Sequence, residues 1–377
     1  MRWQDRSGVE MSSFVDPQTG REIWRLTNSS TMADRHTYYD IDPWSPDGRW
    51  IAFSSAVDSE VTTPVRDLLS TERGAVYLMD AETYAIEWLA GDAFYQTHTG
   101  AFAVWHPQGR SLFYTHSSGR IASVDIATKE VRLIEGSMRQ ISPDGSTIVY
   151  TVNDGPLAGR GVYTMGADGS GLRQIVSTEE VYALTPNRDL FPVDDVTVGN
   201  TKWTPDSGEM LLTIWVGLNK KPGQFHIPGV ERSLYIAGRN GESLRWLTYF
   251  GHHHSWTPSA SSVLFCDWLD PLERQKPRLF LVDADGSNRR VVIDEPLGGH
   301  PIMSPDGSQI ATWDDDGVIV VHVAEQRSEY VATFAGGFDM SHHGTHPHPV
   351  WKADGSALLY NTAQVGPSQL CLLPMPR

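Results

Sequence analysis

Short apolar runs separated by turn residues recur along the whole chain. Each run holds about four residues rich in β-branched, aromatic or aliphatic side chains, and some or all of Pro, Asp and Gly precede it. The runs cover residues 50–53, 111–114, 147–150, 210–213, 263–265, 309–312 and 357–360. Runs this short that are bounded by turn residues are typical of strands, and two of them joined by an Asp/Gly turn predict a β-hairpin. The pattern therefore predicts an all-β protein that needs no long helix.

One phrase introduces each run: a large apolar residue, Ser or Thr, Pro, Asp and Gly. Pro fixes φ and Gly accepts a positive φ, so the phrase predicts a tight turn between two strands. The copies begin at Trp44, Trp105, Ile141, Trp203, Trp256, Met303 and Trp351, the last of them degenerate. Seven copies at intervals of about 40 to 60 residues, each followed by a second hairpin, predict seven propeller blades.

The two ends of the chain complete one blade. The last repeat supplies only residues 369–373 after its first hairpin, and residues 14–20 and 21–26 supply a turn and a strand at the other end. Such closure leaves no open sheet edge. We therefore expect an all-β, seven-bladed β-propeller with four-stranded blades, formed as a single domain over residues 1–377, whose last blade is closed by both termini.

Composition narrows the class of partner. The chain carries 46 acidic and 30 basic residues, a formal net charge of -16, which argues against nucleic acid or an anionic membrane surface. A small anionic ligand stays possible where a local cation is held. No apolar run approaches the roughly 18 residues of a membrane span. The absence of a secretory pattern after Met1 and the presence of only two cysteines predict a cytoplasmic protein.

Function has to be argued from a site, because propellers serve many functions. The position three residues before the apolar residue of each phrase should start an innermost strand, near the propeller axis. It is occupied by Ile41, Phe102, Met138, Asn200, His253, His300 and His348. The first three are apolar, the last four are polar, and three consecutive repeats present histidine. This asymmetry predicts a histidine cluster.

The seventh repeat strengthens a metal-binding interpretation. His346 and His348 are two residues apart, so in an extended strand they would point the same way and could chelate one ion. His300 could supply a third ligand and His343 a fourth. Imidazole suits Zn, Mn, Fe, Ni or Cu, so the donor type does not select the metal. Residues 252–254, all histidines, offer a candidate general base, with no role expected for all three.

Signatures of other enzyme classes are missing from the sequence. It contains no Gly-X-Ser-X-Gly elbow, no P-loop and no dinucleotide-binding glycine pattern. His106 and His116 flank turn phrases and are expected to be structural. His36 precedes Trp44 by the same interval as His343 precedes Trp351, so it could line the mouth of the propeller. Three insertions, at residues 55–75, 174–199 and 215–233, are expected to form loops.

Four patches resemble the oligogalacturonate lyase family. They are His-His-Gly-Thr-His-Pro-His-Pro at 342–349, Gly-His-Pro-Ile-Met-Ser at 299–304, His-His-His-Ser-Trp at 252–256, and Trp-Arg-Leu-Thr at 24–27 ahead of Arg35 and His36. The turn phrase itself resembles the widespread TolB-type propeller repeat. The resemblance implies a seven-bladed propeller that cleaves short pectic oligosaccharides by β-elimination with a manganese-type metal.

The resemblance also implies residue roles. The family's metal ligands, one His, one Gln and a His-X-His pair, fall on His300, His343, His346 and His348, so His343 replaces the Gln and Zn, Fe or Ni become alternatives to Mn. The general base falls on His253. The catalytic arginine falls on Arg232, where Ser233 aligns about as well. Arg35, His36 and Asn200 are expected to contact the substrate.

These roles satisfy the chemistry of uronate β-elimination. The reaction needs a cation at the carboxylate, a base for the C5 proton and a clamp such as arginine. The sequence therefore predicts a lyase for short acidic oligosaccharides. The alternatives are a non-catalytic TolB-like propeller that binds protein or sugar, a lyase for another uronate polymer such as ulvan, and a metal-dependent epimerase-like activity.

Overall fold

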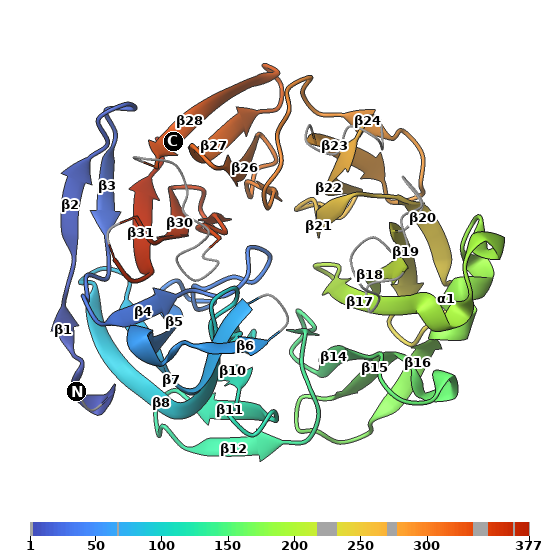
Figure 1. The fold of residues 1–377 in the computed structure, drawn as a ribbon, viewed down its shortest axis with the longest axis horizontal. Coiled ribbons are helices and arrows are strands. Elements are labelled where there is room, and N and C mark those ends of the chain that lie inside the picture. Colours follow the sequence, from blue (N-terminus) through green and yellow to red (C-terminus); the bar gives the residue numbers. More distant parts are fainter. Residues whose placement is uncertain are drawn as a thin grey trace. The chain divides into compact units, whose positions relative to one another are not determined.

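Seven antiparallel sheets contain every strand of the described chain (Figure 1). The computed structural model describes residues 3–65, 68–216, 232–269, 277–334, 346–364 and 366–376. Each sheet is built on four antiparallel strands, so the protein is a seven-bladed β-propeller and the predicted fold class is confirmed. None of the helices in these ranges has the length and apolar character that a membrane span requires.

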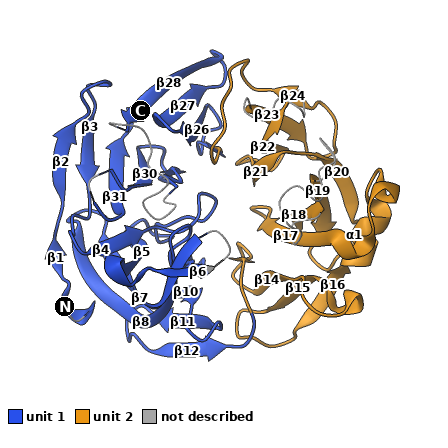
Figure 2. Ribbon diagram, in the orientation of Figure 1, with its two compact units in different colours: residues 1–136, 302–377 blue, residues 137–301 orange. Residues whose placement is uncertain are grey.

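The chain divides into two compact units (Figure 2). Unit 1 comprises residues 1–136 and 302–377 and contains blades one, two, six and seven. Unit 2 comprises residues 137–301 and contains blades three, four and five.

The first two blades of unit 1 follow the chain in order. Blade one contains β4 (Met32–Arg35), β5 (Trp50–Val57), β7 (Leu68–Asp80) and β8 (Ala85–Gln96), with β1 (Gly8–Val9) and β6 (Thr63–Val65) added. Blade two contains β9 (Val104–Trp105), β10 (Ser111–Thr115), β11 (Ile121–Asp125) and β12 (Val131–Ile134). The insertion at 55–75 thus lengthens the hairpin of β5 and β7 instead of forming an irregular loop.

The last two blades of unit 1 include the closure. Blade six contains β25 (Ile302–Met303), β26 (Gln309–Asp314), β27 (Gly317–His322) and β28 (Arg327–Thr333). Blade seven joins β2 (Ser12–Val15) and β3 (Glu22–Arg25) to β29 (Val350–Trp351), β30 (Ala357–Thr362) and β31 (Gln369–Pro374). The pairing of Trp24 with Leu372 confirms the predicted closure by both termini. The N-terminal segment supplies a hairpin, one strand more than a four-stranded blade requires.

Unit 2 repeats the same plan three times. Blade three contains β13 (Gln140–Ile141), β14 (Thr147–Val152), β15 (Gly161–Gly166) and β16 (Arg173–Ser177), and blade four contains β17 (Val196–Trp203), β18 (Glu209–Val216), β19 (Arg232–Gly238) and β20 (Arg245–Tyr249). Blade five contains β21 (His252–Trp256), β22 (Ser262–Trp268), β23 (Pro277–Asp283) and β24 (Arg290–Val291).

Helical structure in the described chain is confined to short segments. The insertion at 174–199 contains α1 (Thr178–Leu184), which starts with a capping box between Ser177 and Glu180. Single 3-10 turns lie at η1 (Trp3–Asp5), η2 (Asp58–Glu60), η3 (Leu157–Gly159), η4 (Arg188–Leu190) and η5 (Val193–Asp195).

The repeated turn phrase is held by one side-chain network. In blade six the Ser304 hydroxyl donates to Asp306 at 2.6 Å and accepts from the backbone N–H of Gln309 at 2.9 Å. Gly307 adopts φ 75°, which explains the glycine of the phrase. The hydrogen bond from Ser304 is the main reason why the pKa of Asp306 falls to about 2. Blades one and three repeat this arrangement with Ser45 and Ser142.

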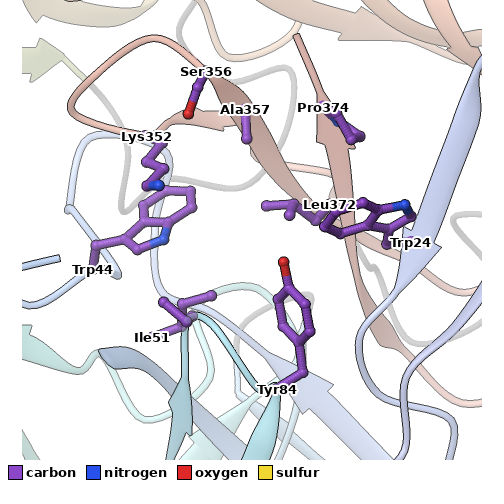
Figure 3. Close-up of a pocket in the computed structure, with 10 residues that line it drawn as sticks. Trp24, Trp44, Ile51, Tyr84, Lys352, Ser356, Ala357, Leu372 and Pro374 are labelled. Atoms are coloured by element: carbon purple, nitrogen blue, oxygen red, sulfur yellow. The ribbon is translucent and has the colours of Figure 1, made fainter. Parts of the chain in front are cut away.

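The tryptophan of the phrase packs one blade on the next. Trp105 of blade two lies in a core cluster with Val76 and Leu78 of blade one, and its indole N–H donates to the Pro43 carbonyl at 2.9 Å. A hollow of about 170 Å³ opens between blades one and seven beside Trp44 and Lys352 (Figure 3). None of the predicted site residues lines this hollow.

Candidate metal centre and base cluster

Three imidazoles come together in unit 1. His346 and His348 precede β29, and His98 lies between β8 and β9. The ring centroid of His98 is 4.6 Å from that of His346 and 4.8 Å from that of His348, and the latter two rings are 5.5 Å apart. One ring nitrogen of each residue lies within 4.8 Å of the others. This is an arrangement in which imidazoles can face one ion.

The backbone that carries His346 and His348 is not an extended strand. Residues 346–349 lie outside any strand, and His348 has φ 46°, a left-handed conformation that is uncommon for a residue with a side chain. Asn361 of β30 holds the segment: its backbone N–H donates to the Pro347 carbonyl at 2.8 Å. The two rings therefore lie near each other because the chain turns at His348, and the period-two alternation predicted for an extended strand does not apply.

All three imidazoles are held neutral. Burial, together with the charges of His346 and Arg35, lowers the pKa of His98 to about 3. Burial and the charge of Arg35 lower the pKa of His346 to about 4. The pKa of His348, whose side chain is fully buried, lies well below its ordinary value for the same leading reason. Neutral imidazole is the form that binds metal ions.

Two predicted substrate contacts lie beside these rings. Arg35 ends β4, is 1% exposed, and donates from Nη1 to the His346 carbonyl at 3.4 Å. His36 is fully buried, its backbone N–H donates to Asn361 Oδ1 at 3.2 Å, and burial lowers its pKa to about 3. Tyr38 packs edge-on against His348 at 4.8 Å. The structure thus places Arg35 and His36 in the surroundings of the three imidazoles.

A second histidine cluster lies in unit 2, at the start of blade five. In β21, His252 pairs with Cys266 and His254 pairs with Phe265, so His253 is the extra residue of a β-bulge. His253 has φ 47°. A bulge re-aims a side chain that would otherwise follow the pleat, and bulges are frequent beside active sites. The bulge therefore takes His253 out of the alternation that His252 and His254 follow.

The contacts of His253 reach the segment of unit 2 that follows β24. Its Nδ1 lies 2.7 Å from Nδ1 of His252 and also contacts the carbonyl oxygen of Gly299. Its ring centroid is 3.7 Å from that of His300, with 30° between the ring planes. The structure thus brings together two residues that the repeat alignment selected independently, His253 and His300.

Arg232, at the start of β19, lies next to this cluster. Its Nη1 donates to the carbonyl of Gly251, the residue before β21, and its guanidinium carbon lies 4.4 Å above the ring of Trp215. Burial, and then the charge of Arg232, lowers the pKa of His252 to about 4. The neighbouring candidate, Ser233, is fully buried.

His254, the third histidine of residues 252–254, is held by contacts with β17. His254 is 1% exposed, its Nε2 lies 3.2 Å from the Asn200 carbonyl, and Lys202 donates to its backbone carbonyl. Asn200 itself has φ 47° in an irregular part of β17. The Asn200 carbonyl is therefore turned toward His254, and the substrate contact of Asn200 stays a prediction.

For two histidines, His343 and His98, the predicted site and the described structure do not coincide. His343 lies outside the described residues, so its predicted metal-binding role stays a prediction. His98 is not among the residues predicted from the sequence. It precedes Trp105 by seven residues, whereas His36 precedes Trp44 by eight, so the interval of the first blade falls on Thr97 in the second.

Two solved structures share the architecture over nearly the whole chain. No protein-family model and no curated protein matches the sequence. An oligogalacturonate lyase in complex with manganese is 17% identical, with a TM-score of 0.73 over 99% of this chain and 98% of that one. An oligogalacturonate lyase from Vibrio parahaemolyticus is 14% identical, with the same TM-score over 99% and 98% of the two chains.

A more distant likeness shows how general the scaffold is. The β-propeller domain of Cps50 (Swd1) from Myceliophteria thermophila is 11% identical, with a TM-score of 0.58 over 94% of this chain and all of that one. At these identities the likeness establishes the fold. The chain therefore has the seven-bladed propeller fold of the oligogalacturonate lyases, and the resemblance predicted from its histidine motifs is confirmed at the level of the fold.

Proposed function

We propose that this protein is a metal-dependent lyase that cleaves short, uronate-containing oligosaccharides by β-elimination. The observation that carries the proposal is the set of three neutral imidazoles in unit 1, in a chain that shares its fold with an oligogalacturonate lyase solved with manganese. The histidine and arginine cluster of unit 2 supports it, because elimination needs a base and a cation for the substrate carboxylate.

The donor set fits a divalent ion. His98, His346 and His348 would hold it, and His300 and His343 remain further ligands predicted from the sequence. When bound, the metal would act as a Lewis acid that neutralises the uronate carboxylate as charge develops there. The resemblance favours Mn, whereas nitrogen donors alone suit Zn, Fe or Ni better than an ion that prefers oxygen.

The other steps belong to the side chains of the protein. His253 would accept the C5 proton, since a neutral imidazole has suitable basicity near neutral pH. Arg232 would pair with the substrate carboxylate, and Arg35, His36 and Asn200 complete the proposed substrate contacts. The acidic chain, with its net charge of -16, favours short oligosaccharides over long polyanions, and we propose a cytoplasmic location.

A substrate panel tests the proposal. The protein is stripped with a chelator, reloaded with Mn, Zn, Fe or Ni, and mixed with oligogalacturonates, ulvan and other uronate polymers while the ultraviolet absorbance of unsaturated products is followed. We expect metal-dependent product formation. H253A should lower kcat about 10²- to 10⁴-fold, whereas H116A, beside the β10–β11 turn, should not.

The panel also separates the alternatives. Activity on ulvan alone would identify a lyase for that polymer. Absence of product with every substrate and metal would reject the lyase and favour a non-catalytic propeller, in which metal removal changes only the stability.

A further inference from the structure

We infer that His252 is a positioning residue that, together with the Gly299 carbonyl, fixes the tautomer of His253 so that Nε2 is the basic nitrogen. The inference rests on the proposed role of His253 as the base. It is carried by the two contacts that meet at one atom, Nδ1 of His253: the Gly299 carbonyl oxygen and, at 2.7 Å, Nδ1 of His252.

The carbonyl favours one position of the proton. A carbonyl oxygen can only accept a hydrogen bond, so its contact with Nδ1 of His253 stabilises the tautomer in which Nδ1 carries the hydrogen. A neutral imidazole carries one such hydrogen, so in this tautomer Nε2 of His253 bears the lone pair. A base that uses Nε2 is therefore prepared before the substrate arrives.

The second contact reinforces the same tautomer. If Nδ1 of His253 were bare, its electron pair would face the Gly299 oxygen, which is repulsive. With Nδ1 of His253 protonated, Nδ1 of His252 can accept from the same N–H, and His252 then keeps its own hydrogen on Nε2. His252 is largely buried and neutral, because burial and Arg232 lower its pKa, so the acceptor is present at neutral pH.

The backbone holds both rings in this relation. His252 is the first residue of β21 and directly precedes the bulge. It is in register with β22, where it pairs with Cys266. Its ring lies 5.5 Å from that of Trp268, the last residue of β22. Gly251 precedes it, and a Cβ there would come within 2.6 Å of the Trp268 ring. His252 is thus fixed on a strand, while His253 bulges out beside it.

Nitrogen NMR on histidine-labelled protein tests the tautomer directly. The apo protein is used, and the His253 signals are assigned by their loss in H253Q. We expect Nδ1 of His253 to be protonated and Nε2 to be bare. In H252L a mixture of both tautomers should appear, and in H252N the wild-type pattern should return, because the Asn Oδ1 accepts where the histidine Nδ1 did.

Enzyme kinetics supply a second test of the role of His252. H252L should lower kcat about tenfold or more with little change in KM, and H252N should recover most of the loss. H322N, at a histidine of blade six that contacts Glu329, serves as the matched control. Unchanged kcat in H252L, or a bare Nδ1 on His253 in the wild type, would overturn the inference. If no uronate is cleaved, the proposed function fails while the NMR arm still judges the tautomer.

Discussion

Left-handed backbone marks the same position in four blades. Phe102, Asn200, His253 and His348 all have φ between 46° and 54°, and each lies three residues before the tryptophan of its turn phrase. Such residues cost on the order of 1–3 kcal/mol each. Because Phe102 shares the geometry without any proposed role, the conformation belongs to the blade, and the histidines occupy positions that the fold already turns away from the sheet.

His98 gives the first prediction for a single residue. H98A removes one of three imidazoles, so it should weaken metal binding by more than about tenfold. Titration calorimetry with Zn and Mn on chelator-stripped protein measures this. H116A, which removes a half-buried histidine beside the β10–β11 turn, should leave affinity unchanged. Equal affinities for H98A and the wild type would exclude His98 as a ligand.

Gly100 gives the second prediction for a single residue. It has φ 57°, and a Cβ there would come within 2.1 Å of Ser54 Oγ and 3.2 Å of Arg35 Cβ. G100A should therefore displace the segment that carries His98 and reduce metal affinity as well as thermal stability. G119A has the same left-handed strain, with φ 81°, but meets nothing within 4 Å. Equal losses in both variants would show that backbone strain alone, and not crowding at the site, is responsible.

At the scale of elements, the N-terminal hairpin of β2 and β3 closes blade seven and is tied to blade six. Asp16, between the two strands, is 1% exposed. Its carboxylate accepts from the backbone N–H and the hydroxyl of Thr333, at 2.6 and 2.8 Å, besides capping its own turn. The closure therefore rests on side-chain bonds as well as on pairing with β31.

Removing this carboxylate should be costly. D16A leaves the half-buried Thr333 N–H without its acceptor, a loss of about 1–3 kcal/mol in the free energy of unfolding. D80A is the control, because Asp80 caps its own turn in the same way, with Thr83 N at 2.8 Å, on an exposed hairpin. Urea denaturation measures both. A D16A loss no larger than that of D80A would argue against the tie to blade six.

At the scale of the whole molecule, the protein combines a net negative charge with neutral histidines that are buried or half-buried. Four of them have pKa values of about 3 or 4: His36, His98, His252 and His346. Burial is the leading cause in each case, so folding withdraws these rings from protonation. Stability and proton uptake are therefore linked.

This linkage should make the free energy of unfolding fall as the pH falls. In the unfolded chain these histidines titrate near their ordinary value of about 6.5, so below that pH unfolding takes up protons. Their contribution is complete above pH 6.5 and is lost as the pH falls toward 4 and then 3. Each histidine changes the free energy of unfolding by roughly 1.4 kcal/mol per pH unit. Denaturation of the chelated protein at pH 7.5, 6 and 5 should show this decline, and constant stability over that range would contradict it.

The blades and their closure could be predicted because they depend on local patterns. A Ser-Pro-Asp-Gly turn between short apolar runs identifies its own hairpin, and seven copies count the blades. The lengthened β5–β7 hairpin and α1 were not anticipated, since insertions carry no repeat. His253 and His300 were selected because equivalent repeat positions can be aligned, whereas His98 was overlooked because it lies off that position.

The sequence by itself determined the all-β class, the number of blades, the closing of the last blade and most of the histidines that the structure brings together. Only the tertiary structure decided how these histidines face one another: that His98 joins His346 and His348, that His348 turns by a left-handed backbone, and that His252 contacts the nitrogen of His253 which meets the Gly299 carbonyl. The reason is physical. Strand and turn preferences act within a few residues, whereas the direction of a ring is set by bulges, burial and carbonyl groups that come from distant parts of the chain.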